Sequence, residues 1–202
     1  GKRYRIDRVE QTDAQLIEAV RVEAGIYQPS DGADERVIPR GFTAPVPVFP
    51  VFLDLPLLNG DEVAHAPHVA VTADPWPGSV AVWSAAADAG YELNRLLAAP
   101  SVMGTTETVL AAAPPGLWDR GPALRVKIVG GTLSSADELA VLNGANAIAI
   151  GDGSPARWEI LQFAEAVLVA PSTYDLSLRL RGQQGTDGIM PVEWPVGSTV
   201  VL

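Results

Sequence analysis

Turn-forming residues recur at short intervals along most of this chain, and their spacing limits the folds available to it. From residue 57 onward, clusters such as LNGDE, DPWPGS and GDGSPA separate short apolar runs such as HVAVTA and ALRVKIV. Gly, Pro, Asn and Asp favour turns, whereas β-branched and aliphatic residues in alternation favour strands. The pattern therefore predicts a mainly β fold, a short-stranded antiparallel sandwich or barrel.

Two segments carry helical signals within this strand pattern. Ser134 or Ser135 is expected to cap a helix over ADELAVL that ends at Asn143-Gly144, because a hydroxyl accepts from free N–H groups and Gly tolerates the left-handed end. A second short helix is predicted over Glu92 to Ala98. The fold class is thus mainly β with one or two short helices.

The N-terminal segment allows two interpretations. Thr12 with Gln15 fits a capping box that opens a helix through Glu23. The alternation in RYRIDRVE, and again from Leu16 to Val22, fits two antiparallel strands joined around residues 11–14. The β-branched content favours the hairpin.

Residues 29–56 are rich in proline, which lacks a ladder N–H and fixes φ. This composition predicts an extended linker between residues 1–28 and a β domain over 57–202. The apolar residues of the segment imply that it lies along a surface; they are Val46, Val48, Phe49, Val51 and Phe52.

Charge and composition exclude several classes of function. The chain has 14 Lys and Arg against 24 Asp and Glu, a formal charge of −10, so its field repels nucleic acid and anionic lipid. It has no cysteine, which excludes disulfides and thiolate metal sites. No apolar run reaches the roughly 18 residues of a membrane span. DNA is therefore expected to pass such a surface without binding.

The residues that could carry catalysis or a metal do not form a recognisable motif. His65 and His68 follow Asp61 and Glu62, but Pro67 disrupts the geometry of a metal site, and a solvated loop explains them better. Glu159 and Glu165 are candidates for a glycosidase carboxylate pair, which needs two acids across a cleft. Solvent faces of strands explain these glutamates more simply. We expect no enzyme activity, no cofactor and no metal.

Tryptophan offers a possible recognition surface. A sugar-stacking or intersubunit role is open to Trp76, Trp83 and Trp118, while core packing is the commoner role of such rings. The sequence leaves both possibilities open.

The segment YDLSLRLRGQQGTDG combines a strand with a glycine-rich loop. The loop lacks the spacing of a phosphate-binding loop. Gly182 and Gly185 indicate backbone that needs positive φ or close approach. Arg179 and Arg181 share one strand face with Asp175. Either a turn with a cross-strand ion pair or a shaped loop against a neighbouring subunit fits this pattern.

This loop, with WEILQFAEAVLVAPST before it and LNGANAIAIG upstream, resembles the tail-protein region of the large baseplate or tail-tip hub protein of gene transfer agents and related tailed phages. In that family W-E-x-x-Q-F leads into L-x-L-R-G-x-x-G-T-[DE]. The resemblance covers roughly Pro56 to Leu202 and is most specific from Trp158 to Asp187. The N-terminal hairpin, 1–28, is similar to the end of the preceding hub domain.

The resemblance implies a structural virion component: a homotrimer at the tail tip that surrounds the DNA channel and contacts other tail-tip, baseplate and tail-tube proteins. Such a protein is made in the bacterial cytoplasm, is released in the particle, and serves DNA ejection and host attachment. A glycosidase-like domain found in some members would lie outside this chain. The resemblance implies an assembly contact at Arg179, Arg181, Gly182, Gly185, Thr186 and Asp187. A carbohydrate-binding or receptor-binding module and a fragment of a cell-wall glycosidase are the alternatives.

Overall fold

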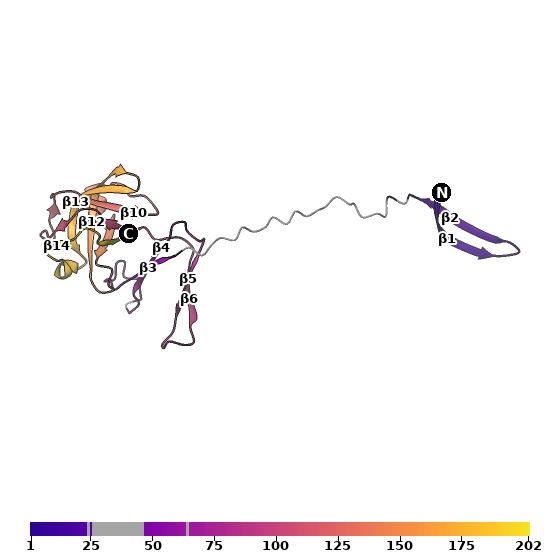
Figure 1. Cartoon of the computed structure of the whole chain (residues 1–202), viewed down its shortest axis with the longest axis horizontal. Helices are drawn as coiled ribbons and strands as arrows, with labels where there is room; N and C mark the ends of the chain where they lie inside the picture. Colours follow the sequence, from indigo (N-terminus) through magenta and orange to yellow (C-terminus); the bar gives the residue numbers. More distant parts are fainter. Residues whose placement is uncertain (24, 26–46, 64) are drawn as a thin grey trace. The chain divides into compact units, whose positions relative to one another are not determined.

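The computed structural model describes residues 1–23, 25, 47–63 and 65–202. The chain divides into two compact units, Gly1–Thr43 and Ala44–Leu202 (Figure 1). Residues 29–46 of the predicted linker lie outside the described residues.

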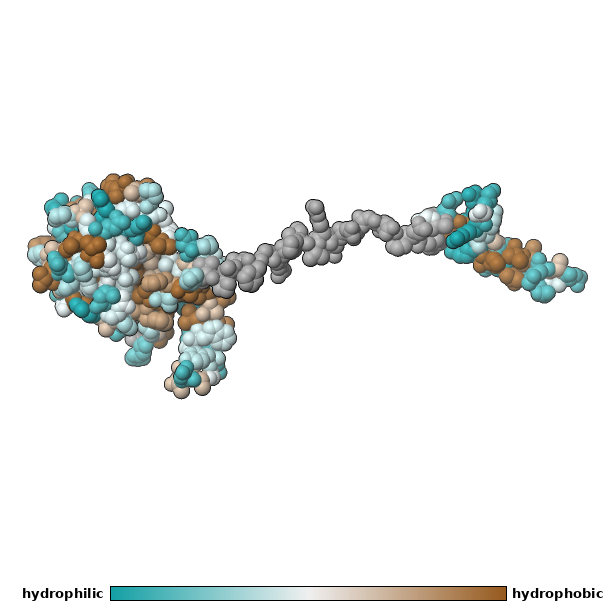
Figure 2. Space-filling model, in the orientation of Figure 1, coloured by the Kyte–Doolittle hydropathy of each residue, from teal (hydrophilic) through white to brown (hydrophobic). Residues whose placement is uncertain are grey.

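The described part of the first unit forms a hairpin of β1 (Arg3–Gln11) and β2 (Gln15–Val22). Gln11 pairs with Gln15, and the Thr12 hydroxyl donates to Ala14 O over 2.9 Å in the turn. The prediction of a hairpin is therefore confirmed, and Thr12 forms part of a turn where the capping-box alternative placed a helix start. Apolar side chains on the hairpin remain exposed, and Figure 2 shows a brown area on it. The largest exposed side chains are Tyr4, Ile6, Val9, Leu16, Ile17 and Val20.

The second unit is built around a closed barrel in which every strand pairing is antiparallel. The strand order is β10-β7-β15-β11-β12-β13, and β13 pairs back with β10. The six strands are β7 (Met103–Thr106), β10 (Leu124–Val129), β11 (Ala147–Gly151), β12 (Trp158–Ala170), β13 (Thr173–Gln183) and β15 (Thr199–Val201). This arrangement confirms the mainly β prediction and identifies its form as a barrel.

Alternation along the strands fills the barrel with side chains. On β10, Leu124, Val126 and Ile128 are buried, while Arg125 and Lys127 point the other way. Six strands enclose too little space for anything beyond side chains. The main core cluster consists of Leu110, Leu124, Val126, Ile128, Leu133, Ile148, Ile150, Leu161, Phe163, Tyr174, Leu176, Trp194 and Val200.

Further short strands lie outside the six strands of the barrel. β9 (Trp118–Asp119) pairs with the later part of β13, and β8 (Leu110–Ala111) pairs with β14 (Glu193–Trp194). A separate ladder joins β3 (Phe49–Leu53) to β4 (His68–Thr72).

The β3–β4 ladder packs on the outside of the barrel. Val51, Leu53 and Ala70 form a buried cluster with Met103 and Trp158. The end of the predicted linker is thus a strand with a packed face. Proline is compatible with this strand because Pro50 is paired with Val71, whose own N–H donates to Ser101 on the opposite side.

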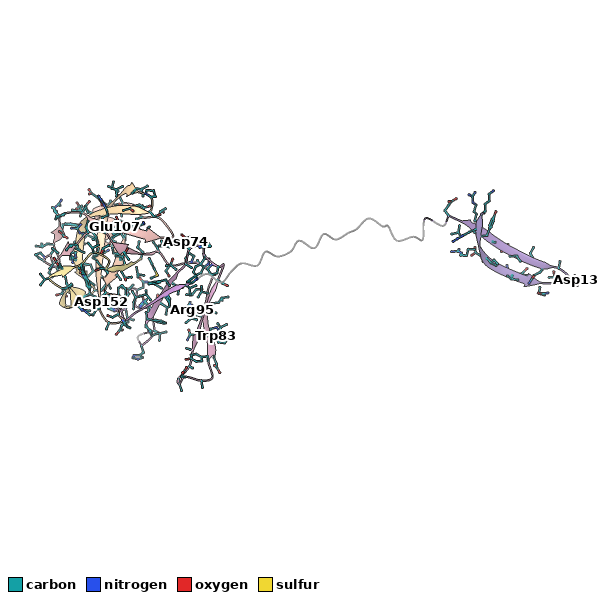
Figure 3. All side chains as sticks on the ribbon, viewed as in Figure 1. Asp13, Asp74, Trp83, Arg95, Glu107 and Asp152 are labelled. Carbon is teal, nitrogen blue, oxygen red and sulfur yellow. The ribbon has the colours of Figure 1, made fainter. Side chains whose placement is uncertain are left out.

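A second hairpin consists of β5 (Val80–Ser84) and β6 (Glu92–Leu97). The prediction of a helix over Glu92 to Ala98 is therefore wrong: the segment pairs with β5, and that pairing outweighs a helix signal in so short a segment. Every residue of the two strands is exposed or half-buried. Figure 3 labels Trp83 and Arg95 on this hairpin.

The second unit has one α-helix among its described residues, α1 (Glu138–Leu142). Its N-cap is Asp137, whose carboxylate accepts from Ala140 N over 2.9 Å, so the predicted cap at Ser134 or Ser135 is wrong. The predicted end is confirmed, with Asn143 as C-cap and Gly144 at φ 100°. A 3₁₀ helix, η2, spans Thr186–Ile189. None of the described helices is long and apolar enough to cross a membrane.

Candidate functional site

The glycine-rich loop predicted as a contact site adjoins a buried network of charged side chains. Arg181 and Glu159 are at its centre, and both side chains are fully buried. Arg181 Nε donates to Glu159 Oε1 over 2.7 Å, and Nη2 donates to Oε2 over 2.9 Å. This bidentate geometry is the strongest form of a carboxylate–guanidinium pair.

Other groups complete the hydrogen bonding of this pair. Trp194 Nε1 donates to Glu159 Oε2 over 2.6 Å, and Gly182 N donates to Oε1 over 3.1 Å. Arg181 Nη1 donates to Ala111 O over 2.5 Å. The carboxylate thus accepts four hydrogen bonds, which compensate for its removal from water.

A second pair adjoins the first. Arg179 donates through Nε and Nη2 to Asp119 Oδ2, over 3.0 and 2.8 Å, and through Nη1 to Leu176 O over 2.7 Å. Asp119 also lies 3.8 Å from Arg181 Nη1. The two arginines and two carboxylates therefore form a network with no net charge.

The pKa of Asp119 reflects opposing causes. Burial alone would raise it, but the Gly121 N–H bond, the Arg179 hydrogen bond and the charges of Arg179 and Arg181 outweigh burial and lower the pKa. Asp119 is therefore ionised at neutral pH, and the network holds its carboxylate as a fixed anion.

The loop itself adopts left-handed backbone at several residues. Gly182, Gln184 and Gly185 have φ of 57°, 56° and 77°. A Cβ at Gly182 would lie 2.7 Å from Asp187 Cβ, so the prediction of close approach there is correct. Thr186 is buried; its hydroxyl accepts from Ile160 N over 2.9 Å and donates to Gln183 O over 2.7 Å. The Thr186 hydroxyl thus attaches the loop to β12.

The predicted contact residues fall into two groups. Arg179, Arg181, Gly182 and Thr186 are buried, whereas Gly185 and Asp187 are exposed. The side chains of Arg179 and Arg181 are therefore not available to a neighbouring subunit, which the sequence did not reveal because alternation along a strand does not show which face other elements cover. The arginines support the loop, and Gly185 and Asp187 belong to its exposed surface together with Gln184 and Gly188.

The alternative prediction of a cross-strand ion pair is confirmed. Arg179 is paired with Asp119 across the β13–β9 ladder, and Arg181 reaches Glu159 on β12. Asp175, which shares their strand, instead binds Arg125 on β10, with 2.7 and 2.8 Å between the groups. Sequence reasoning missed Asp119 and Trp194 as members of the network. Asp119 lies 60 residues before Arg179 in the chain, and Trp194 follows the loop closely but has no local signal that marks it as a partner of Glu159.

The candidate carboxylate pair for glycoside hydrolysis is not assembled. Glu159 and Glu165 lie on one strand six residues apart, a separation of about 20 Å at the rise of a β-strand. Glu159 is occupied by the network, and Glu165 is exposed and accepts from the Ser177 hydroxyl over 2.6 Å. Neither carboxylate faces the other across a cleft.

The histidines and tryptophans are dispersed. Among the described residues, no group of three or more His, Asp or Glu side chains could hold a metal ion, and this includes His65 and His68. Trp83 is exposed on β5, whereas Trp76 and Trp118 are half-buried. Trp118 packs against a small cluster that includes Val141 and Leu180.

Comparison with known proteins identifies the C-terminal half of the chain. Residues 101–201 match the family model described as Rcc01698-like, C-terminal. No curated protein matches the chain. The matched residues include all six strands of the barrel and the entire charge network.

Proposed function

The chain belongs to the Rcc01698-like, C-terminal family, whose members are associated with gene transfer agents and phages. From this premise we propose that it is a structural component of a tail tip or baseplate hub. In this role it forms a symmetric ring around the DNA channel and connects the tail tube to host-facing parts. The observation that carries the proposal is the family match over residues 101–201, which coincides with the barrel and its loop.

The packed core of the barrel supports a channel that lies outside the barrel. Leu124, Ile150, Leu161 and Leu176 fill the interior with no exposed surface. DNA therefore passes between copies of the chain and not through a barrel. The formal charge of −10 suits such a wall, because like charge prevents DNA from adhering.

We propose a homotrimer, in contact with other tail-tip, baseplate and tail-tube proteins. We place it at the tail tip of a virion or gene-transfer-agent particle. The protein is made in the bacterial cytoplasm and is released within the particle. Gly185 and Asp187, which lie on the exposed part of the loop, form the proposed contact with a neighbour. We assign no catalytic step to this chain.

A cryo-EM map of the tail tip of the assembled particle tests the proposal. The barrel and its β12–β13 ladder are the features to trace in the density. The expected result is three copies about the tail axis, each with residues 184–188 against a neighbouring subunit. Absence of the chain from the particle, or its presence as a single peripheral copy, would contradict the proposal.

A receptor-binding or carbohydrate-binding module is the second candidate, and one observation favours it. The Trp83 ring is 56% exposed on the β5–β6 hairpin, as a ring that stacks on sugars must be. A glycan array tests this directly. Glycan binding that is lost in Trp83→Ala and kept in Trp118→Ala would support a carbohydrate-binding module. If the chain binds no glycan on the array, this candidate function is refuted.

A further inference from the structure

A small cavity lies between the β3–β4 ladder and the barrel. Its volume is about 170 Å³. Exposed residues at its rim, Leu58, Ala147 and Leu202, leave it open to solvent. The apolar side chains of its walls are buried or half-buried and come from both layers; they are Leu53, Leu55, Ala70, Ala149, Ile160 and Val201.

His68 places one polar atom in this apolar wall. His68 lies directly opposite Leu53 in the β3–β4 ladder, so the two side chains share one face of the ladder. Leu53 packs with Met103 and Trp158 of the barrel, which identifies this face as the one that covers the barrel. His68 Nδ1 is buried there, and no group among the described residues forms a hydrogen bond with it. Roughly nine in ten buried polar groups have a partner, so this atom is available to a ligand.

The volume and the walls define the size and the chemistry of that ligand. An apolar cavity of about 150 Å³ stays dry and binds benzene, so a cavity of about 170 Å³ accommodates one benzene-sized ring. Aliphatic walls offer such a ring dispersion contacts on several sides. In small-molecule sites, a single polar group in an apolar wall fixes the orientation of the ligand.

We propose that this cavity binds a small phenolic compound, with the ring against Leu53 and Val201 and the hydroxyl hydrogen-bonded to His68 Nδ1. A hydroxyl both donates and accepts, so it pairs with either tautomer of the imidazole. Toluene has nearly the same shape but would leave Nδ1 without a partner. A charged group in place of the hydroxyl would lose its hydration against the apolar walls.

A larger cleft beside the cavity leaves room for the rest of such a molecule. The cleft has a volume of about 610 Å³ and shares His68 and Val69 with the cavity. Asp61, Asn94 and Arg95 supply polar groups to its walls. A phenolic compound with a polar substituent can therefore occupy both spaces. This site does not involve the loop of the proposed ring contact, so it does not depend on the proposed function.

Titration of the whole chain with phenol and with toluene, followed by methyl NMR, tests the proposal. Ligands of this size bind with Kd on the order of 1 mM. The methyl signals of Leu53 and Val201 should shift with both ligands up to about 5 mM, whereas those of Leu124 in the barrel interior should not. If neither ligand shifts the cavity methyl signals, the proposal is overturned.

His68→Leu tests the hydrogen bond. This variant removes Nδ1, so the ratio of the toluene Kd to the phenol Kd should fall about tenfold from its wild-type value, as expected for one hydrogen bond to a buried group. The ratio separates the hydrogen bond from the apolar contacts, which the two ligands share. An unchanged ratio would refute the assignment of a phenolic ligand.

Ala147→Phe tests the location of the ligand. Ala147 is exposed at the rim, so a phenyl ring at this position should close the cavity without altering the core, and both ligands should lose their binding. Ala170→Phe makes the same change at an exposed alanine of β12 outside the cavity and should bind both ligands as the wild type does. Unchanged Leu124 methyl signals in every variant show that the barrel is folded. Wild-type affinity in Ala147→Phe would place the ligand elsewhere and overturn the proposal.

Discussion

Arg181 and Glu159 form a bidentate ion pair with no exposed surface on either side chain, 22 residues apart in the chain and on adjacent strands of a closed barrel. The Gly182 N–H donates to the same carboxylate. The pair thus fixes the point at which β13 turns into the exposed loop. A change in the pair is transmitted to the loop through this backbone contact.

Arg181→Ala should reduce the free energy of unfolding by about 3–5 kcal/mol, because it leaves the Glu159 carboxylate buried without its cation. Urea denaturation monitored by tryptophan fluorescence measures this. The double variant Arg181→Met with Glu159→Leu should recover much of the loss, because neither charge then remains. The control is Arg125→Ala, whose partly exposed pair with Asp175 should contribute far less. Equal losses for Arg181→Ala and Arg125→Ala would contradict the role given to burial.

Gly182→Ala should destabilise the chain more than Gly185→Ala. Both residues have positive φ, but a Cβ meets Asp187 only at Gly182 and has open space at Gly185. The left-handed strain costs about 1–2 kcal/mol at either position, and overpacking adds about 1–3 kcal/mol at Gly182. Thermal unfolding of the two variants checks the difference. If Gly185→Ala is the less stable variant, the close approach of Gly182 to Asp187 does not limit the substitution.

Acid should weaken the fold through Asp175 and Asp119. The hydrogen bond from Arg125 lowers the pKa of Asp175 below its ordinary value of 3.8, and the pKa of Asp119 is lowered as well. A carboxyl group with a lowered pKa contributes stability above its unfolded pKa, and this is lost as pH falls through the folded pKa. Asp175→Asn should therefore be less stable than the wild type at neutral pH, and the two should converge in acid. Denaturation curves measured from pH 7 to below 3 give the free energy of unfolding of both proteins. A difference between them that stays constant over this range would refute the linkage.

Asp187→Lys should leave the fold intact but block particle assembly if the loop contacts a neighbour. Asp187 is exposed, so the free energy of unfolding should change by no more than about 0.5 kcal/mol. Electron microscopy of particles from cells that carry the variant gives the readout, namely the fraction with complete tails. Glu193→Lys makes the same change of charge at another exposed residue and should give normal tails. Normal tails for Asp187→Lys would show that the loop is not part of the assembly interface.

Local sequence determined most of the secondary structure, because turn residues and alternation act within a few positions. The N-terminal hairpin and the end of α1 at Asn143 followed from such signals. The helix predicted over Glu92 to Ala98 failed for the opposite reason: a partner strand satisfies its backbone, and the segment alone does not indicate that partner. The cap at Asp137 was missed because several neighbouring side chains could serve as caps.

By itself, the sequence determined that the chain is mainly β, acidic and free of cysteine, and that backbone near Gly182 must be left-handed or closely approached. Only the tertiary structure decided that the strands close into a barrel and that Arg179 and Arg181 lie inside. It also decided that Asp119 and Glu159 neutralise them. The physical reason is that burial depends on which strands become neighbours. Strand neighbours are selected by the free energy of the whole core, while turns and alternation depend on residues adjacent in the chain.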